Sequence, residues 1–495
     1  MEENGGCPLC QSNPLEQTTK LTNISWIQCD ICEEWFHSNC LGLRINDVNN
    51  LHSYHCEKCS KKHGPSVEKR RLKRKKLHID YVALNDGETY AVDKTAHPHV
   101  DNFLNFEVNA NEAGDKGNPY FDILDHIDQE YIYNSRLKKP VLVPNADYKK
   151  VGMHLPYPSS EITIDRITTS VGEDLPVEVM DVLTQQSVVP GWKMWQWRDY
   201  FHTDTESRDR IRNVISLEIS DVDALGKDFI RPSVVRNLDL VDKVWQSRDE
   251  RPKVTKYCLM SVGGSFTDFH VDFSGTAVYY NVCIGSKTFL MYPPSPENLG
   301  LYESWCLEPD QNYTWFGDYH ITKGNKKVAP SGGFKITLQE GDLFFIPSGW
   351  IHSVYTSQDS VVLGGNFLTL MSLPTHLDIY EIEKRTKVPS KYQFPKFNKV
   401  LWLTSFYYLS HQQEFVEDIE GHSRIKKEDF PPDEESGALS ISGEVLERLI
   451  EHLKKHYEKS KTSQVARNGI PTEIIGKDVE KFLKTLESWL DNIRA

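Results

Sequence analysis

Residues 265–273 have the sequence SFTDFHVDF, which is rich in aromatic residues, contains no strand breaker and predicts a β-strand. Residues two apart on a strand point to the same side, so His270 and Asp272 are expected to project together. Residues 346–355, IPSGWIHSVY, begin with a turn and continue into a second predicted strand, which carries His352. Two histidines and one carboxylate form a facial ligand set for Fe(II) that leaves positions open for a cosubstrate and oxygen. We therefore predict an iron site at these residues.

The size and composition of the chain predict two or three folded domains. It has 495 residues, of which 39% are hydrophobic and 11% aromatic, enough for a packed core. The formal net charge is 57 − 71 = −14, which argues against a protein that coats nucleic acid along its whole surface. The sequence contains no run of about 18 apolar residues, and residues 1–10 lack the features of a signal peptide. We expect an intracellular protein with no membrane partner.

Cysteines cluster near the N-terminus, where seven of the ten lie within the first 59 residues. They form three C-x-x-C pairs, and a histidine and a cysteine form a fourth pair with the same spacing. The eight donors supply two tetrahedral zinc sites, because each zinc takes four such ligands. A disulfide set is the alternative, but an odd number of cysteines in an intracellular chain argues against it. The predicted zinc ligands are Cys7, Cys10, Cys29, Cys32, His37, Cys40, Cys56 and Cys59.

The ligand order of four cysteines, one histidine and three cysteines resembles that of a PHD finger. A RING finger also cross-braces two zincs, but its ligand order differs and it lacks the segment Trp35-Phe36-His37 found here. The resemblance implies cross-braced ligation by alternate pairs. One zinc is then expected on Cys7, Cys10, His37 and Cys40, and the other on Cys29, Cys32, Cys56 and Cys59.

Residues 26–37, WIQCDICEEWFH, closely resemble the centre of PHD fingers that read methylated histone tails. Trp26 and Trp35 fall at the positions of that family's aromatic cage, while Gly6 stands where many such readers have a further aromatic residue. Aromatic faces bind a methylated ammonium by cation–π attraction. The resemblance therefore implies a reader of methylated lysine 4 of histone H3. Packing inside a small zinc domain is the alternative role for both tryptophans.

A basic run, KRRLKRKK, occupies residues 69–76 within a linker over residues 63–80. Three roles fit it: a nuclear import signal, a contact with the DNA backbone, and a solvated linker. The attraction of such a run to phosphate is strong, salt-dependent and independent of sequence. We expect a nuclear protein, and the contact with DNA remains one of the open roles.

The central region resembles the Jumonji-C (JmjC) histone lysine demethylases in several stretches. These are NVISLE at 213–218, TDFHVDFSGT at 267–276, IPSGWIH at 346–352 and GGNFL at 364–368. Residues 383–389, EKRTKVP, are especially similar to the subfamily that demethylates lysine 36 of histone H3, and an N-terminal PHD finger suits its fungal members. The resemblance covers the first 60 residues and residues 175–400.

This resemblance implies a role for each residue of the predicted active site. Lys287 lies 287 − 270 = 17 residues past the first iron ligand, where the family has a lysine that meets the distal carboxylate of 2-oxoglutarate. An exposed hairpin lysine is the alternative for Lys287, and ordinary strand packing is the alternative for Thr267 and Tyr280. Ser274 stands where relatives often carry glycine. The implied assignments are His270, Asp272 and His352 as iron ligands, Thr267 and Lys287 on the distal carboxylate, and Asn213 and Tyr280 near the keto-acid end.

The resemblance also implies the reaction and its cofactors. The enzyme would use Fe(II), 2-oxoglutarate and O2 to hydroxylate an N-methyl group of mono- or dimethylated lysine 36 of histone H3, which then leaves as formaldehyde. Two zinc ions would complete the finger, and the histone H3 tail or nucleosome would be the partner. Two alternatives remain open: a protein hydroxylase on the same core, and a catalytically silent scaffold that binds chromatin.

The expected architecture is mixed, with a small cross-braced zinc module followed by a double-stranded β-helix of the jelly-roll or cupin type and then helices. The expected segments are the finger at 1–62, the linker at 63–80, a lead-in at 81–175, the JmjC core at 176–400 and a helical region at 401–495. Two sets of apolar residues in the last segment recur at helical spacing. Such helices form either a cap on the core or a pair that binds a partner. The two sets are Val445, Leu446, Leu449, Ile450, Leu453 and Tyr457, and Val479, Phe482, Leu483, Leu486, Leu490 and Ile493.

Overall fold

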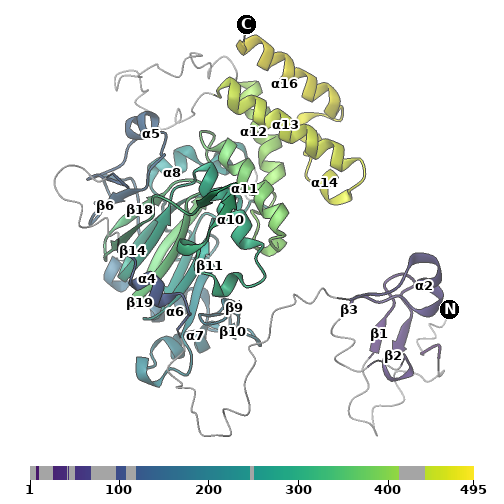
Figure 1. The fold of residues 1–495 in the computed structure, drawn as a ribbon, viewed down its shortest axis with the longest axis horizontal. Coiled ribbons are helices and arrows are strands. Elements are labelled where there is room, and N and C mark those ends of the chain that lie inside the picture. The colour runs from purple at the N-terminus through teal and green to yellow at the C-terminus, as the bar shows by residue number, and fades with distance from the viewer. Residues whose placement is uncertain are drawn as a thin grey trace. The chain divides into compact units, whose positions relative to one another are not determined.

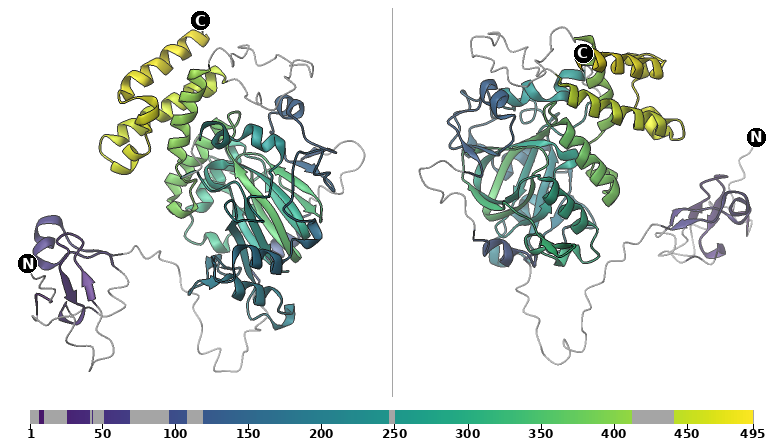
Figure 2. Two further views of the ribbon diagram at one scale, coloured as in Figure 1. Left: turned by 180° about the vertical axis from the view of Figure 1, so that it is seen from behind. Right: turned by 45° about the horizontal axis from the view of Figure 1, so that its top comes forward.

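The computed structural model describes residues 7–9, 26–41, 43, 51–68, 96–107, 119–245, 250–411 and 441–494. The chain divides into two compact units, Met1–Glu88 and Thr89–Ala495 (Figures 1 and 2). Among the described residues, no helix combines the length and the apolar character needed to cross a membrane.

The first unit is built on a short hairpin of β1 (Trp26–Gln28) and β2 (Trp35–His37). Trp26 pairs with His37 and Gln28 with Trp35, so these residues share one face of the hairpin. Ile27 and Phe36 lie on the other face and are buried in a small apolar cluster with Tyr54. The remaining described elements are the 3-10 helix η1 (Asn39–Leu41), β3 (Leu51–Ser53), α2 (Glu57–His63) and β4 (Val67–Glu68).

Two long antiparallel strands, β14 (Ala277–Tyr292) and β19 (Ile351–Phe367), form the centre of the second unit. The first part of β14 pairs with β18 (Leu343–Ile346), and its second part pairs with β17 (Phe334–Leu338). In the same way β19 pairs first with β13 (Phe266–His270) and then with β12 (Tyr257–Ser261). Each long strand thus serves both halves of the sheet, which confirms the predicted double-stranded β-helix core.

The other strands extend this sheet on both sides, in the order β5-β6-β18-β14-β19-β12-β11-β8-β9. The added strands are β5 (Asp122–Ile123), β6 (Val141–Val143), β8 (Met180–Asp181), β9 (Gln186–Ser187) and β11 (Arg212–Glu218). Two small hairpins lie outside it: β7 (Pro176–Val177) with β10 (Trp192–Lys193), and β15 (Ile321–Lys323) with β16 (Lys326–Val328).

A glycine permits β14 to pass from one half of the sheet to the other. The register with β19 shifts three times between Val282 and Thr288, and Gly285 lies within this stretch at φ +81°. A Cβ at this position would come within 2.3 Å of the backbone oxygen of Asp359. Glycine is therefore required both for the left-handed backbone and for the close approach of the two strands.

Helices surround the sheet and then form the C-terminal region (Figure 1). The helices that precede the C-terminal region are α4 (Val100–Leu104), α5 (Gln129–Ser135), α6 (Ile164–Val171), α7 (Met194–Phe201), α8 (Ser233–Leu238), α9 (Leu240–Val244) and α10 (Pro296–Cys306). Those that follow the sheet are α11 (Leu373–Thr386), α12 (Phe397–Ser410), α13 (Gly443–Ser460), α14 (Gln464–Asn468), α15 (Thr472–Ile475) and α16 (Val479–Arg494).

The two sets of apolar residues at helical spacing form α13 and α16, as predicted. Most of them are buried, and Val445, Tyr457 and Ile493 are partly buried against the same cluster. This cluster also contains Leu240 of α9 and Leu368, just after β19. The apolar faces of α13 and α16 therefore pack onto the rest of the second unit, as a helical cap would.

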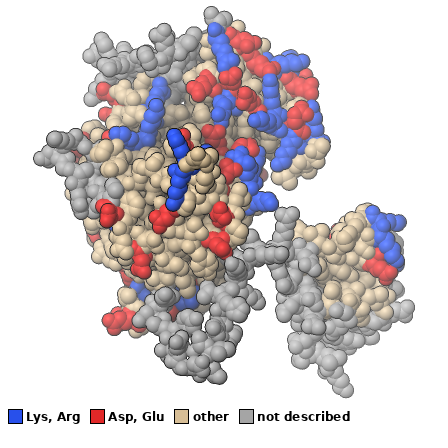
Figure 3. Space-filling model, in the orientation of Figure 1, with Lys and Arg blue, Asp and Glu red and all other residues tan. Residues whose placement is uncertain are grey.

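The outer surfaces of α13 and α16 carry acidic and basic side chains together (Figure 3). Some of these charges pair between the two helices, including Lys454 with Glu487 and Arg494 with Glu447. On this part of the surface, charges of both signs are interspersed. The basic run at 69–76 lies outside the described residues.

Candidate functional site

The two predicted iron-binding histidines lie opposite each other on neighbouring strands. His270 at the end of β13 pairs with His352 near the start of β19, and their ring centroids are 4.3 Å apart. The Oδ2 atom of Asp272 lies 3.7 Å from Nε2 of His352. The fold thus brings together residues that are up to 82 positions apart (352 − 270 = 82) in the sequence.

The strand that carries this motif is shorter than predicted. The sequence predicts a strand over 265–273, but β13 ends at His270, and Asp272 precedes a short 3-10 helix, η5 (Phe273–Gly275). Ser274 adopts a left-handed backbone at φ +49°, and its N–H donates to Oε1 of Glu383 on α11 at 2.6 Å. The turn fixed in this way, and not strand alternation, places the Asp272 carboxylate beside His352.

Hydrogen bonds leave Nε2 of both histidines available. Nδ1 of His270 lies 2.8 Å from the carbonyl oxygen of Asp268, and Nδ1 of His352 lies 3.0 Å from that of Trp350. A ring that donates from Nδ1 to a carbonyl carries its lone pair on Nε2. Burial, with the nearby His270, lowers the pKa of His352 to about 4, so this imidazole is neutral at pH 7. Two imidazoles and a carboxylate fit the donor preference of Fe(II).

Asn366 on β19 supports the carboxylate and was not predicted from the sequence. Its Nδ2 donates to Oδ1 of Asp272 at 3.1 Å and to the Thr276 hydroxyl at 2.9 Å. Asn366 is buried. The residue lies within the conspicuous stretch GGNFL, but only the pairing of the strands shows which side chain it contacts.

Asn366→Ala is expected to weaken iron binding and turnover by about 10- to 100-fold, the usual cost of removing a partner that orients a metal ligand. Asn281→Ala is the matched control, because Asn281 is a fully buried amide on β14 whose Nδ2 donates to the Cys283 sulfur. Iron titration monitored together with formaldehyde release tests the prediction. Equal iron affinity in the two variants would show that Asn366 does not orient Asp272.

Lys287 is buried in a pocket of neutral hydroxyl groups. Its Nζ donates to the hydroxyls of Ser261 at 2.5 Å and Thr356 at 2.7 Å. The Ser261 hydroxyl donates to Oδ1 of Asn213 at 2.7 Å, and Nδ2 of Asn213 lies 3.4 Å from the Thr267 hydroxyl. The structure therefore joins the predicted residues Asn213, Thr267 and Lys287 in one network through Ser261, and it adds Thr356 as a second partner of Lys287. The sequence revealed neither Ser261 nor Thr356.

The electrostatic state of Lys287 suits an anionic ligand. In the described part of the chain, no carboxylate forms an ion pair with this residue, which is 3% exposed. Burial lowers the pKa of Lys287 to about 7, because the charged form loses its hydration. A bound carboxylate would supply the missing counter-charge, so the pocket fits the distal carboxylate of 2-oxoglutarate.

Tyr280 on β14 lies near the site but outside this network. Its ring is 6% exposed and packs edge-on against Phe289, with centroids 5.2 Å apart. Phe289 in turn lies 5.9 Å from the ring of His352. Among the described residues, no hydrogen bond joins the Tyr280 hydroxyl to the network of Lys287, so its predicted place near the keto-acid end stays a prediction.

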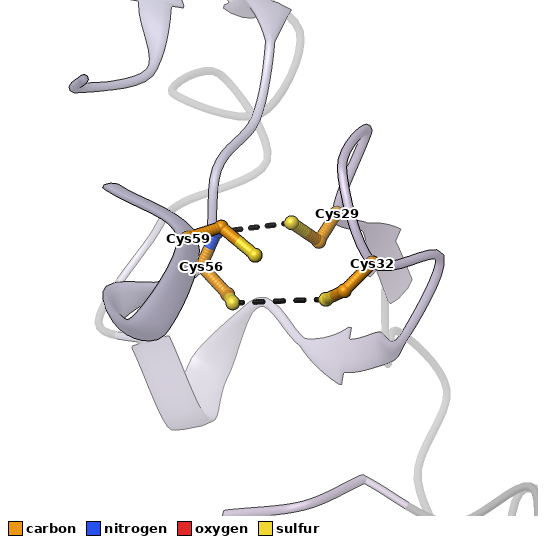
Figure 4. A group of neighbouring side chains, drawn as sticks. All are labelled: Cys29, Cys32, Cys56 and Cys59. Carbon is orange, nitrogen blue, oxygen red and sulfur yellow. Dashed lines mark hydrogen bonds between the residues drawn. The ribbon is translucent and has the colours of Figure 1, made fainter. Parts of the chain in front are cut away.

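The finger brings four of its cysteines together (Figure 4). One ligand atom from each of Cys29, Cys32, Cys56 and Cys59 lies within 4.8 Å of the others. Burial raises the pKa of Cys29, but backbone N–H groups, first those of Cys32 and Cys56, outweigh this effect and lower it to about 6. Burial, with the neighbouring sulfurs, raises the pKa of Cys59 instead. The fit to a tetrahedral zinc ion therefore rests on the four sulfurs lying together.

A second group in the finger contains Cys7, His37 and Cys40, again within 4.8 Å of one another. The backbone N–H of His37 donates to the Cys7 sulfur at 3.4 Å. Cys10, the predicted fourth ligand, lies outside the described residues. The two groups match the cross-braced division into alternate pairs, and the zinc assignment itself stays a prediction.

The two predicted cage tryptophans lie on the same face of the hairpin, diagonally across from each other. Trp35 is 49% exposed, an unusual exposure for so large an apolar side chain. Trp26 is partly buried, and its ring centroid lies 3.8 Å from that of His37. Trp35 is therefore free to meet a ligand, whereas Trp26 also packs against a predicted zinc ligand.

Three family models match successive parts of the chain. The UBR7-like PHD finger matches residues 5–65, the Cupin-like domain matches residues 186–369, and the Jumonji helical domain matches residues 371–487. These matches agree with the finger, the β-helix core and the helical region seen in the structure.

Similar proteins from yeasts extend the likeness to the whole chain. The JmjC domain-containing histone demethylation protein 1 of Debaryomyces hansenii is 59% identical, with 98% of each chain covered. The protein of the same name from Candida albicans is 51% identical, also over 98% of each chain. That from Saccharomyces cerevisiae is 37% identical, over 80% of this chain and 87% of its own.

Proposed function

This chain belongs to the family of the JmjC domain-containing histone demethylation protein 1 and is a 2-oxoglutarate-dependent histone demethylase, and we propose that it acts on mono- and dimethylated lysine 36 of histone H3. The family membership confirms the demethylase predicted from the sequence. The similarity of residues 383–389 to the lysine 36 subfamily supports the choice of lysine.

The catalytic proposal rests on one observation. The same sheet carries both a set of predicted iron ligands and the Lys287 pocket, which suits a carboxylate. His270, Asp272 and His352 offer two imidazoles and a carboxylate, supported by Asn366. The Lys287 pocket offers a buried cation without an acidic partner. Bound Fe(II) and 2-oxoglutarate would supply the oxidation of an N-methyl C–H bond by O2, with succinate and carbon dioxide as co-products.

The chain's own residues would bind, orient and exclude water. His270, Asp272 and His352 would hold the metal on one face and leave the opposite face for the cosubstrate. Lys287 would neutralise the distal carboxylate, while Thr267 and Asn213 would complete the hydrogen bonds around it. Burial of Asn213, Lys287 and His352 would help to keep bulk water from the reacting centre. The hydroxylated methyl group then leaves the lysine nitrogen as formaldehyde.

For the finger, we propose two zinc ions and a role as a reader of methylated lysine 4 of histone H3. The two groups of sulfur and nitrogen donors support the zinc ions. The exposed face of Trp35 supports the reader. A nuclear location, with the histone tail or nucleosome as partner, follows from this proposal. We also propose that residues 69–76 contact the DNA backbone, and this part of the proposal rests on the sequence alone.

Trp35→Ala is expected to weaken binding of a trimethylated lysine 4 peptide by a factor that corresponds to roughly 0.5–2 kcal/mol of cation–π attraction. Turnover of a short lysine 36 peptide should stay unchanged, because the finger tethers the enzyme and takes no part in catalysis. The matched control is Trp195→Ala, which removes another exposed tryptophan, 40% accessible, from α7.

The paired measurement is peptide affinity and formaldehyde release, with zinc content as the check on folding. If Trp35→Ala abolished turnover of the short peptide while the zinc content stayed normal, the finger would belong to the catalytic unit. If it left the peptide affinity unchanged, the reader proposal would be wrong.

The choice of lysine is tested by a panel of histone H3 peptides, each methylated at one lysine. We expect formaldehyde from the mono- and dimethylated lysine 36 peptides and little from the others. Formaldehyde release from a peptide methylated at a different lysine would agree with a demethylase but would show that lysine 36 is not its substrate. A product that keeps the added oxygen would indicate a protein hydroxylase, and no product at all would indicate a silent scaffold.

A further inference from the structure

A third group of potential metal ligands lies outside both the finger and the predicted iron site. His97 and His99 lie at the start of α4, and Asp268 lies on β13. Their exposed fractions are 2%, 2% and 8%. One ligand atom from each lies within 4.8 Å of the other two. Both histidines precede the Cupin-like match, which begins at residue 186, so this group joins two distant parts of the second unit.

The hydrogen bonds of His99 leave one ring nitrogen unsatisfied in either neutral form. Its Nδ1 lies 3.2 Å from both oxygens of Asp268, while its buried Nε2 has no hydrogen-bond partner among the described residues. If the ring proton is on Nδ1, the lone pair of Nε2 is buried without a donor. If it is on Nε2, the lone pair of Nδ1 faces two carboxylate oxygens. In the second case, a cation between Nδ1 and the carboxylate would accept the lone pair and remove this repulsion.

An ion pair between a protonated His99 and Asp268 would not satisfy the hydrogen bonds of this group either. If His99 were fully protonated, the charged N–H at Nε2 would be buried without an acceptor. Burying an unpaired charged N–H costs more free energy than burying an unpaired neutral one. Within the described parts of the chain, no lysine or arginine pairs with Asp268. His97 presents Nδ1 as an acceptor to the backbone N–H of His99 at 3.2 Å, so this nitrogen also carries a lone pair.

We propose that His97, His99 and Asp268 bind a divalent transition-metal ion. Two imidazoles and one carboxylate are donors that zinc and iron(II) both accept. Zinc bonds of about 2.0–2.2 Å in a tetrahedron separate two ligand atoms by about 3.3–3.6 Å. The 3.2 Å between Nδ1 of His99 and the oxygens of Asp268 lies close to the short end of that range. His97 supplies the third donor from within 4.8 Å of the other two.

The ion would hold the strand that carries the first iron ligand. The carbonyl oxygen of Asp268 lies 2.8 Å from Nδ1 of His270, and its backbone N–H donates to Oε1 of Gln185 at 3.1 Å. A metal on the Asp268 carboxylate would therefore fix β13 against the 96–107 segment. Its role would be structural, because Phe266 and Trp315 pack against the two histidine rings.

The test counts bound metal in the full chain with the predicted iron site disabled. In the background Asp272→Ala/His352→Ala, the total of zinc, iron, nickel and manganese is measured by mass spectrometry after dialysis against metal-free buffer. His99→Asn is then added, because asparagine retains a donor toward Asp268 but is a poor metal ligand. We expect the loss of one ion per chain. The matched control is His126→Asn, since His126 is a surface histidine that also contacts an aspartate through Nδ1, at 2.7 Å.

The difference of one ion is the result that counts, and it does not depend on how many ions the finger holds. His97→Gln is the second variant and should lose the same ion, with circular dichroism as the check on folding of both. Equal metal content in the background, His99→Asn and His126→Asn chains would overturn the proposal.

Discussion

Asp272→Ala is expected to reduce formaldehyde release from a dimethylated lysine 36 peptide to the background level. The substitution removes the only anionic ligand predicted for iron, so both metal binding and turnover should be lost. The loss should exceed the roughly 10- to 100-fold expected for removal of a residue that only orients a ligand. The side chain of Asp272 is 20% exposed and lies beyond the end of β13, so the fold should tolerate its truncation.

The measurement compares iron content and formaldehyde release in wild type, Asp272→Ala and Asp318→Ala. Asp318 is an exposed aspartate of the same unit and serves as the matched control. Iron binding and activity should disappear together in the first variant and remain in the second. Demethylation at the wild-type rate in Asp272→Ala would show that the proposed set of iron ligands is wrong.

Lys287→Met is expected to raise the apparent KM for 2-oxoglutarate by about 10- to 100-fold, with much of the rate recovered at saturating cosubstrate. A hydrogen bond to a charged group contributes about 1.5–3 kcal/mol, and each 1.4 kcal/mol changes affinity about tenfold. Methionine keeps most of the side-chain volume, so the buried pocket stays filled. If KM is normal and excess 2-oxoglutarate changes nothing, Lys287 is not the anchor.

In the absence of 2-oxoglutarate, Lys287→Met is expected to stabilise the folded protein. Burial holds the pKa of Lys287 near 7 in the folded state, below its ordinary value of 10.5, so the unfolded chain binds more protons between these values. The free energy of unfolding of the wild type should therefore rise with pH from about 7 to 10.5 through this group. Lys287→Met should lack this rise, and its thermal midpoint should exceed that of wild type most clearly at and below pH 7.

The parts of this protein that could be predicted from its sequence are those that short-range patterns encode. Three C-x-x-C pairs and His37-x-x-Cys40 place zinc ligands within one turn of each other. The spacing of apolar residues predicts the buried faces of α13 and α16, because helical geometry repeats every few residues. The motif around His270 predicts a strand for the same reason, and β13 forms over most of it.

The parts that could not be predicted depend on how distant strands pair. Ser261 and Thr356 bond the same atom of Lys287, although they lie 26 and 69 residues from it. Neither belongs to a local motif, and only the pairing of β12, β14 and β19 brings them together. The position of Asp272 was expected from strand alternation, but a left-handed turn at Ser274, held by Glu383 of α11, produces it instead.

The central claim is tested most directly by the mass of a histone H3 peptide dimethylated at lysine 36 after incubation with the enzyme, Fe(II), 2-oxoglutarate and O2. The account predicts that the peptide loses the mass of one methylene group per turnover, with one formaldehyde and one succinate formed, and that Asp272→Ala leaves it unchanged. A peptide that gains the mass of one oxygen atom, or remains unchanged with wild-type enzyme whose iron site is loaded, would contradict it.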